Sequence, residues 1–363
     1  MVGAGIVGAA CAYYLAQAGY ATLVIDEGFA GGGVTAAGMG HIVVMDDSEA
    51  QFALTSYSRR LWAGLSEEDG ASWEDDPCGS LWLAEDEEEL QVVRQKEDFY
   101  RSRGVEAETI SGEDVAELEP NLRAGLAGAL RVPEDRVVYP PLAAKYLLDR
   151  AIELGVVARL GERIESLGPK RVNTANETIE AEVVINAAGA GASRLTSGLP
   201  VEPRKGHLVI TDRYGGFCRH QLVELGYLKS AHTMTTESVA FNVQPRITGQ
   251  LLIGSSRELV GWDISINHRV LKAMLTRAHH FLPDLESLSA IRTWTGFRPA
   301  TPDKLPLIGK WPRIDGLWLA TGHEGLGITT ALATGKILVA LLGGEKPEID
   351  PQPYDPARFL PES

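Results

Sequence analysis

The sequence predicts an α/β protein in which a discontinuous nucleotide-binding domain is interrupted by an α+β domain with a mainly antiparallel sheet. Three observations support this prediction: a glycine-rich loop at the amino terminus, a β-rich stretch in the middle, and a return of strand-and-helix patterning after residue 300. A length of 363 residues suggests about two domains. We expect the first domain over 1–45, 135–200 and 300–363, and the second over 46–134 and 201–299, with an acidic helical segment at 67–119.

The amino-terminal loop contains a GxGxxG pattern made by Gly3, Gly5 and Gly8. In a Rossmann-like domain the first glycine permits the tight turn, the second lets the backbone approach a pyrophosphate, and the third lets the following helix pack on the sheet. That helix, expected over 7–18, points its N–H groups and positive dipole end at the phosphates. Asp26 lies 18 residues after Gly8, where it can accept hydrogen bonds from a ribose diol. The sequence therefore predicts a bound dinucleotide.

The other elements of this domain follow from apolar spacing, prolines and glycines. Only two residues precede Gly3, fewer than the ~5 of an ordinary strand, so the pattern leaves the first strand unexplained. A helix that begins at Pro140-Pro141 and ends at Gly155 has the usual placement of proline and glycine. The remaining expected elements are strands at 21–25, 156–160, 183–187 and 316–322, and an apolar, buried helix at 327–342.

The β-rich middle of the chain is expected to form much of the second domain. Residues 238–246 and 249–258 predict antiparallel strands joined by a glycine turn. Ser111 and Asp114 are spaced as a capping box for a short helix that Pro120 ends. The spacing of apolar residues also predicts a strand at 203–211 and helices at 51–65 and 268–281.

Charge is distributed unevenly along the chain. The net charge is −15, from 34 basic and 49 acidic residues. Residues 67–119 hold 19 of the acids and 4 of the bases, which leaves 30 of each elsewhere. An acidic surface repels nucleic acid and anionic membranes, and no nucleic-acid partner is expected. Two interpretations of the segment stay open: a solvated, helix-rich insert, or a docking face for a basic partner subunit.

Cysteine usage and hydropathy restrict where the protein works. Cys11, Cys78 and Cys218 are few, odd in number and widely spaced, which argues against disulfides or a metal cluster. We therefore expect no metal and a cytoplasmic location, with peripheral association with the inner membrane left open. No run of ~18 apolar residues is seen in the sequence, so no transmembrane segment is expected. The amino terminus lacks the basic start of a signal peptide.

Five motifs occur along the chain in an order that resembles a known family. They read GAGIVG, AAGMG, VVINAAGAGAS, RTWTGFRPATPDKLPLIG and GLWLATGHEGLGITTALATG. Together they cover essentially the whole chain and resemble the D-amino-acid oxidase superfamily of FAD-dependent oxidoreductases, in particular its glycine-oxidase-like and sarcosine-oxidase-like branch. Within that branch the sequence looks most similar to the flavin subunits of bacterial amino-acid dehydrogenases, such as D-hydroxyproline dehydrogenase and hydrogen cyanide synthase.

The resemblance implies FAD, and the residues agree with it. An isoalloxazine ring needs glycine-rich backbone beyond the nucleotide loop, and this chain has two such stretches, 31–40 and 322–327. A helix beginning near Gly327 would aim its positive end at the flavin edge where negative charge collects on reduction. No cysteine occurs in DKLPLIGKWP, and we do not expect His41 to form a tether, so the FAD should be non-covalent. The expected cofactor-binding residues are Gly3, Gly5, Ile6, Val7, Gly8, Asp26, Glu27, Ala37, Gly38, Met39, Gly40, Ala188, Gly189, Arg298, Gly322, His323, Gly325, Leu326, Gly327 and Ile328.

The resemblance also implies a substrate site, made of Arg298, Met39, Asn242, His323 and Glu324. In the family the arginine of the GFRP motif holds the substrate carboxylate, a task that suits its planar fork. Met39 falls where glycine oxidases have a methionine beside the substrate, and Asn242 where they have a tyrosine. Gly325 falls where they have a second arginine, so a glycine substrate is not assured. His323 and Glu324 are candidates to contact a substrate amine, with a structural role as the alternative for each.

These features predict an FAD-dependent enzyme that oxidises the CH–NH bond of a small amino acid or a cyclic imino acid resembling D-proline or hydroxyproline. Hydride would pass to flavin N5 and leave an imine, with oxygen, a quinone or a partner subunit as the final electron acceptor. The alternative is a flavin-binding subunit of a hetero-oligomeric amino-acid dehydrogenase that is inactive or weak alone. An NAD-dependent dehydrogenase is disfavoured by the additional glycine-rich stretches.

Overall fold

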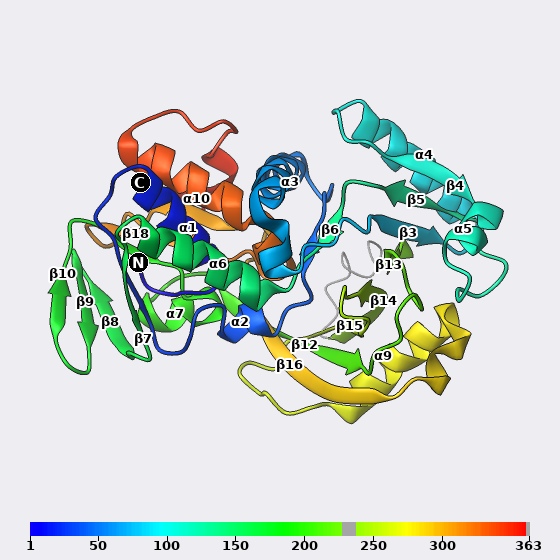
Figure 1. Cartoon of the computed structure of the whole chain (residues 1–363). Helices are drawn as coiled ribbons and strands as arrows, with labels where there is room; N and C mark the ends of the chain where they lie inside the picture. Colours follow the sequence, from blue (N-terminus) through cyan, green and yellow to red (C-terminus); the bar gives the residue numbers. More distant parts are fainter. Residues whose placement is uncertain (227–236, 361–363) are drawn as a thin grey trace. The chain divides into compact units, whose positions relative to one another are not determined.

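The computed structural model describes residues 1–226 and 237–360, and the chain forms two compact units (Figure 1). The first unit comprises Met1–Trp73, Tyr139–Arg204 and Phe297–Ser363, and the second comprises Glu74–Val138 and Lys205–Gly296. Residues 46–73, expected in the second domain, lie in the first unit because helix α3 (Glu49–Asp69) packs against α10 (Gly327–Gly343). Residues 227–236, within the expected β-rich stretch, lie outside the described residues.

Val2, the second residue of the chain, connects two groups of strands in the first unit. Val2 forms parallel bridges with Ile25 and Asn186, and so connects the pair β1–β7 to the three strands β11–β18–β17. The backbone hydrogen bonds at these bridges involve Met1, Val2 and Gly3. The strands are β1 (Leu23–Asp26), β7 (Val157–Leu160), β11 (Val184–Asn186), β17 (Leu307–Lys310) and β18 (Leu317–Thr321), of which β17 runs antiparallel to β18.

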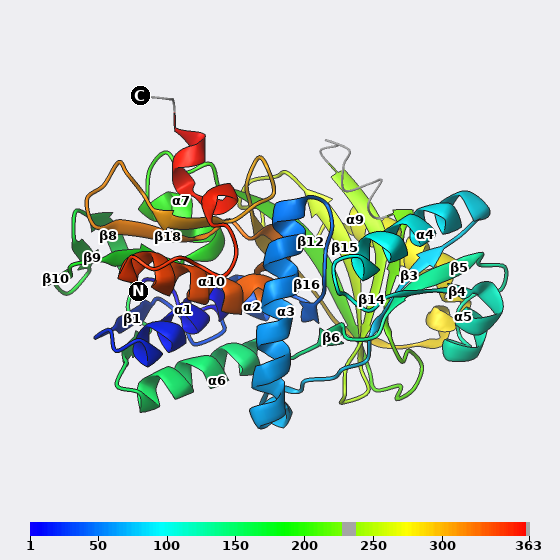
Figure 2. The same cartoon turned by 90° about the horizontal axis from the view of Figure 1, so that it is seen from above.

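Three helices lie side by side in the first unit, with α1 (Ile6–Gln17) between α6 (Pro140–Glu153) and α10 (Figure 2). Small residues allow the close approach of α1 and α10. A Cβ on Gly335 would stand 3.0 Å from the carbonyl oxygen of Ala10 and 2.7 Å from the ring of Tyr14. By length and composition Glu324–Gly343 is apolar enough to cross a membrane, but 56% of the most apolar window is buried inside the protein. Its packing against α1 and α3 is that of a core helix, as the sequence predicts.

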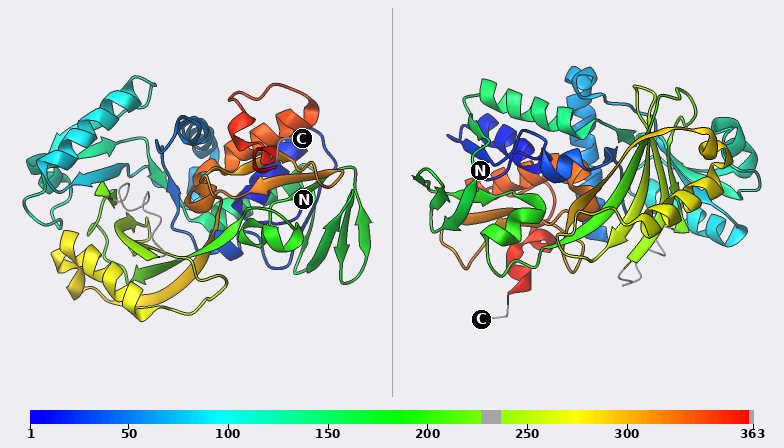
Figure 3. Two further views of the ribbon diagram at one scale, coloured as in Figure 1. Left: turned by 180° about the vertical axis from the view of Figure 1, so that it is seen from behind. Right: turned by 90° about the horizontal axis from the view of Figure 1, so that it is seen from below.

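Smaller elements complete the first unit. An antiparallel meander of β8 (Ile164–Gly168), β9 (Arg171–Thr174) and β10 (Thr178–Glu180) is seen at its edge (Figure 3). The others are α2 (Gly33–Ala36), β2 (His41–Ile42), α7 (Ala192–Leu195) and the 3-10 turns Gly70–Trp73, Gly189–Gly191, Glu324–Leu326, Gln352–Tyr354 and Pro356–Phe359.

The second unit is built on an eight-stranded sheet in the order β16-β12-β15-β14-β13-β3-β5-β4. β13 and β3 are parallel, while β12–β15, β15–β14, β14–β13, β3–β5 and β5–β4 are antiparallel, as expected for this domain. The strands are β3 (Ser80–Ala84), β4 (Glu108–Ser111), β5 (Gly128–Val132), β12 (Glu202–Thr211), β13 (Gln221–Glu224), β14 (Glu237–Pro245), β15 (Leu251–Glu258) and β16 (Ala290–Ala300), with the short β6 (Arg136–Val137) nearby in sequence.

Helix α9 (His268–Phe281) lies against β14 and β15 (Figure 3). Phe281 of this helix stacks on Phe241 of β14 with ring centroids 4.4 Å apart, at the centre of the apolar core. The acidic segment contains α4 (Glu87–Arg101) and α5 (Gly112–Leu118). Ser111 and Asp114 form the predicted capping box at the start of α5. A 3-10 turn, Pro283–Ser287, follows α9.

Candidate active site

The glycine turn at the amino terminus leaves no room for side chains. Gly3 has φ +108°, a conformation that L side chains rarely adopt, and a Cβ there would lie 2.5 Å from the carbonyl oxygen of Ala187. A Cβ on Gly8 would lie only 2.0 Å from the carbonyl oxygen of Gly3. The first and third glycines therefore have the steric roles that the GxGxxG pattern predicts: a tight turn, and close packing of helix α1 on it.

The amino-terminal end of α1 has no side-chain cap from its N-cap residue. Gly5 is its N-cap residue and makes no side-chain cap, and no acidic residue lies in the first turn. The amide of Ile6 donates to Thr35 Oγ1 at 3.0 Å, which ties α2 to this end of the helix. Uncapped N–H groups with a positive dipole end suit a phosphate. Thr35 lies in the glycine-rich stretch but was not among the expected cofactor-binding residues, because a lone threonine in a loop gives no distinctive pattern.

The carboxylate of Asp26 accepts hydrogen bonds from nearby backbone amides and is also partly exposed to solvent. Its Oδ2 accepts the amide of Ala4 at 2.7 Å, and its Oδ1 accepts the amide of Gly28 at 2.7 Å. Each carboxylate oxygen has a second lone pair, so these bonds leave acceptor capacity for a ribose hydroxyl. Asp26 is partly buried, whereas the neighbouring Glu27 is exposed. The carboxylate therefore fits both a structural role and the expected cofactor role.

The loop 37–42 lies beside the start of α10. A Cβ on Gly38 would stand 3.1 Å from the Cδ1 atom of Ile328. Thr329 Oγ1 donates to the carbonyl oxygen of His41 at 2.9 Å. Trp62 Nε1 donates to the carbonyl oxygens of Ile328 and Thr329, both at 3.1 Å, and so fixes the first turn of α10. These contacts bring Ala37, Gly38, Met39 and Gly40 together with Gly327 and Ile328, although the two stretches are far apart in sequence.

His41 carries a buried polar atom without a partner. Among the described residues, no group forms a hydrogen bond with its Nε2. Burial, reinforced by the positive charge of Arg298, lowers the pKa of His41 from 6.5 to about 3, so the ring is neutral near pH 7. A buried imidazole nitrogen of this kind requires a partner, and a bound ligand would supply one.

A second glycine-containing turn lies at the carboxyl ends of β11 and β18, where a ligand can come close to the backbone. Gly189 has φ +53°, and its carbonyl oxygen accepts Thr321 Oγ1 at 2.9 Å. A Cβ on Gly189 would stand 3.6 Å from Cγ2 of Val34 in α2. Ala188 and Gly189 thus lie near the loop that also contacts α1. Ligands of open α/β sheets bind at the carboxyl ends of parallel strands, and this is such a position.

Arg298 lies near the end of β16 and faces the loop that precedes α10. A Cβ on Gly325 would stand 3.8 Å from Cδ and Nε of Arg298, which is an ordinary contact distance. Gly322, with φ +80°, begins this loop, and a Cβ there would be 2.7 Å from Cγ2 of Thr301. The loop residues Gly322, Gly325, Leu326 and Gly327 and the arginine are therefore neighbours in the first unit.

His323 and Glu324, adjacent in this loop, point to different partners. His323 is 4% exposed, and its Nε2 lies 2.9 Å from Thr334 Oγ1 inside the unit. Burial lowers its pKa from 6.5 to about 3. This placement supports a structural role for His323. Glu324 instead pairs with Arg204 at the start of β12, a residue that the sequence analysis did not single out because it lies outside every motif.

Asn242 belongs to the second unit, on β14, and is 7% exposed. Its Oδ1 is buried and has no hydrogen-bond partner in the described part of the chain. An unpaired buried amide oxygen is consistent with ligand contact, as expected for this position.

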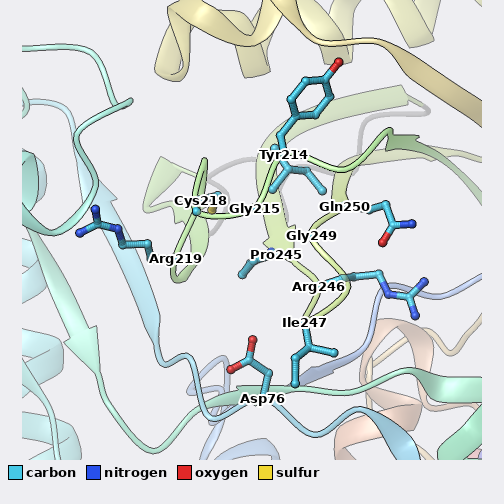
Figure 4. A pocket seen from close by; sticks show the side chains of 12 residues that line it. Asp76, Tyr214, Gly215, Cys218, Arg219, Pro245, Arg246, Ile247, Gly249 and Gln250 are labelled. Atoms are coloured by element: carbon cyan, nitrogen blue, oxygen red, sulfur yellow. The ribbon is translucent and has the colours of Figure 1, made fainter.

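A pocket of about 230 Å³ also lies within the second unit (Figure 4). Its walls come from the turn between β14 and β15 and from the segment before β13, and they include Asp76, Tyr214, Cys218 and Arg246. Burial raises the pKa of Asp76, opposed by the nearby His220. Arg246 forms an ion pair with Glu74, so its charge is already matched. None of the expected substrate or cofactor residues lines this pocket.

The described residues of the first unit fit FAD at the place formed by the amino-terminal glycine turn, the loop 37–42 and the loop before α10. The glycine turn admits a phosphate-bearing chain, two helices present uncapped amino-terminal ends, and His41 Nε2 lacks a partner. The residues that would hold it are those of the Gly3–Gly8 turn, Asp26, Thr35, the loop 37–41, Gly189 and the loop 322–328. Bound there, FAD supplies a two-electron acceptor.

Comparisons with known proteins agree with FAD as the cofactor. Residues 1–341 match a protein family described as FAD dependent oxidoreductase. Glycine oxidase from Pseudomonas aeruginosa is 30% identical over 99% of this chain and 98% of its own length, and hydrogen cyanide synthase subunit HcnC from the same species is 27% identical over 100% and 96%. The crystal structure of L-proline dehydrogenase from P. horikoshii superposes with a TM-score of 0.88 at 26% identity, covering 99% of this chain and 96% of that one. The chain therefore belongs to the DAO family of FAD-dependent oxidoreductases.

Proposed function

We propose that this chain oxidises the CH–NH bond of a small amino acid or a cyclic imino acid of the D-proline or hydroxyproline type, with FAD as the oxidant and an imine as the product. The observation that carries the proposal is Arg298, which lies beside Gly325 in the loop leading to the uncapped start of α10. Because residue 325 has no side chain, only the backbone of this residue lies beside Cδ and Nε of Arg298, and we propose that a small carboxylate binds there.

Arg298 is the proposed carboxylate clamp. A guanidinium fork binds a carboxylate through two parallel, charge-assisted hydrogen bonds, which fixes the orientation of the substrate as well as its position. His41, whose pKa of about 3 reflects burial and the charge of Arg298, is neutral near pH 7 and adds no second positive charge beside the clamp. Orientation of the Cα–H bond toward the acceptor is the main contribution expected of Arg298.

The names of related proteins support a small amino or imino acid. One relative is a glycine oxidase and one structural neighbour is an L-proline dehydrogenase. Met39, in the loop beside α10, and Asn242, with its unpaired buried oxygen, are proposed to contact the substrate. The absence of a side chain at Gly325 leaves space that a ring could fill, which favours a cyclic imino acid over glycine itself.

An alternative function is a flavin-binding subunit of a larger assembly, weak or inactive alone. HcnC is named as a subunit, and the acidic segment 67–119 offers a surface for a basic partner. Activity of the isolated chain with an artificial dye would favour the enzyme over this alternative.

The decisive test is anaerobic bleaching of the flavin near ~450 nm by glycine, sarcosine, D- and L-proline and hydroxyprolines. Bleaching by one class identifies the substrate. Arg298→Ala should then raise KM about 100-fold, since two hydrogen bonds to a charged group contribute about 3 kcal/mol together. The control is Arg292→Ala, an exposed arginine on the same strand, which should leave KM unchanged. Unaltered kinetics in the Arg298 variant would rule out the clamp.

A further inference from the structure

A second arginine lies at the same loop as Arg298. Arg204 Nη1 donates to Glu324 Oε1, and the two side chains are 21% and 14% exposed. Arg204 and Arg298 lie on β12 and β16, which are neighbours in the sheet. Arg204 pairs with Glu324, and Cδ and Nε of Arg298 lie beside the adjacent Gly325.

Glu324 has an unusual backbone and an incompletely used carboxylate. Its φ is +46°, a left-handed conformation that is uncommon for residues other than glycine and concentrates at functional sites. Its Oε1 binds Arg204, whereas Oε2 has no hydrogen-bond partner among residues 1–226 and 237–360 and is not sealed from solvent. The loop thus holds one accessible carboxylate oxygen in a fixed place.

The charges around the loop match an amino acid at two points. Arg298 offers a cation to the substrate carboxylate, and Glu324 Oε2 offers an acceptor to a substrate N–H. The charge of Arg204 is already matched by Glu324. We propose that Glu324 Oε2 accepts the substrate's amine N–H, and that Arg204 is the positioning residue that holds Glu324 for this contact. This inference rests on the proposed function.

Such a contact would strengthen during the reaction. When the Cα–H bond breaks, the hydrogen leaves with both electrons to the bound FAD, and the nitrogen lone pair becomes the second bond of C=N. Positive charge then grows on nitrogen. A fixed carboxylate beside that nitrogen stabilises this charge more than it stabilises the neutral amine, which lowers the barrier.

Loss of Arg204 is also expected to affect Arg298. Glu324 directly precedes Gly325, where a Cβ would stand 3.8 Å from Cδ and Nε of Arg298. Without Arg204, the Glu324 carboxylate would compete with the substrate carboxylate for Arg298. Loss of Arg204 should therefore weaken every carboxylate ligand, whereas loss of Glu324 should weaken only ligands with an N–H.

Two ligands that cannot be oxidised separate these effects. Pyrrole-2-carboxylate has a ring N–H, and 2-furoate has the same shape with an oxygen there. Their dissociation constants are measured on FAD-loaded protein by calorimetry. Wild type should bind pyrrole-2-carboxylate about 10-fold more tightly, as one hydrogen bond to a charged acceptor predicts. Glu324→Gln should reduce this preference to about 2-fold and leave 2-furoate unchanged.

Variants of Arg204 complete the test. Arg204→Gln should weaken both ligands about 10-fold, Arg204→Lys should retain most of the affinity, and the double variant Arg204→Gln/Glu324→Gln should regain 2-furoate binding without the N–H preference. Arg150→Gln, which removes an exposed ion pair with Glu153, is the matched control. Equal binding of the two ligands by wild type, or a preference that survives Glu324→Gln, overturns this inference alone. If neither ligand binds wild type, or both bind Arg298→Ala normally, the proposed function fails with it.

Discussion

Gly8 offers a sharp test of the glycine turn, because helix propensity and close packing predict opposite effects for its replacement. Gly8 lies in the first turn of α1, where alanine would ordinarily be favoured over glycine by about 1 kcal/mol. In this structure a Cβ at that position would be 2.0 Å from the carbonyl oxygen of Gly3. Gly8→Ala should therefore destabilise the protein even though it improves the helix.

The size of the effect follows from the geometry. Real Cβ atoms essentially never approach another atom closer than 3.0 Å, so the helix and the turn must separate by at least 1.0 Å, from 2.0 to 3.0 Å. Both groups are backbone in a buried turn, and no side chain can move aside. Overpacking of this kind typically costs 1–3 kcal/mol. We expect a loss of about 2 kcal/mol, a fall in Tm of about 3 °C, and reduced FAD content because the phosphate site is displaced.

The assay compares thermal unfolding and the ratio of flavin to protein absorbance in purified variants. Gly64→Ala is the matched control, since Gly64 is an exposed glycine inside α3 and a Cβ there would have no neighbouring atom within 4 Å. That variant should gain about 0.5–1 kcal/mol and keep its FAD. If Gly8→Ala instead unfolds at the wild-type temperature with full FAD content, the turn does not have the tight geometry described above.

Two further predictions concern the cofactor and the second unit. Acid precipitation should release all of the FAD into the supernatant, because no cysteine lies in DKLPLIGKWP; yellow colour in the pellet would contradict non-covalent binding. Burial alone would raise the pKa of Glu85, but hydrogen bonds from His280, Arg277 and Arg123 outweigh it and lower the pKa from 4.5 to about 2, so its stabilisation is present above pH 4.5 and lost as the pH falls toward 2. Glu85→Gln should lower stability at pH 7 and flatten the loss of stability between pH 5 and 2 in chemical denaturation, and an unchanged pH dependence would refute this role.

The elements predicted best are those with strong local signals. Helix α9 begins and ends where its apolar spacing indicated, and the pair β14–β15 has the antiparallel arrangement expected around a glycine turn. The Ser111 capping box is present, because Ser and Asp three residues apart satisfy each other's backbone groups without help from the rest of the chain. Local chemistry decides these features, so a single sequence is sufficient to find them.

Other features depend on tertiary contacts and could not be found this way. The place of Val2 between Ile25 and Asn186 could not be read from the sequence, because both bridges depend on distant segments. The expected boundary at residue 45 missed that α3 packs on α10, since helical spacing shows which face is apolar but not what covers it. Arg204 gave no signal, because an arginine at the start of a strand is ordinary until Glu324, 120 residues later, is brought beside it.

Each unit combines an apolar core with backbone approaches that exclude a single methyl group, and this determines where the chain can change. Such approaches occur at Gly3, Gly8 and Gly335 in the first unit and at Gly112 and Gly128 in the second. The second unit also has a charge network in which Arg277 joins Glu85 and Glu224. Position 325 belongs to neither the close backbone approaches nor the apolar cores, since a Cβ there would make only ordinary contacts. Substitutions at position 325 can therefore alter the groups around Arg298, the proposed carboxylate clamp, without disturbing either core, so substrate preference can diverge here.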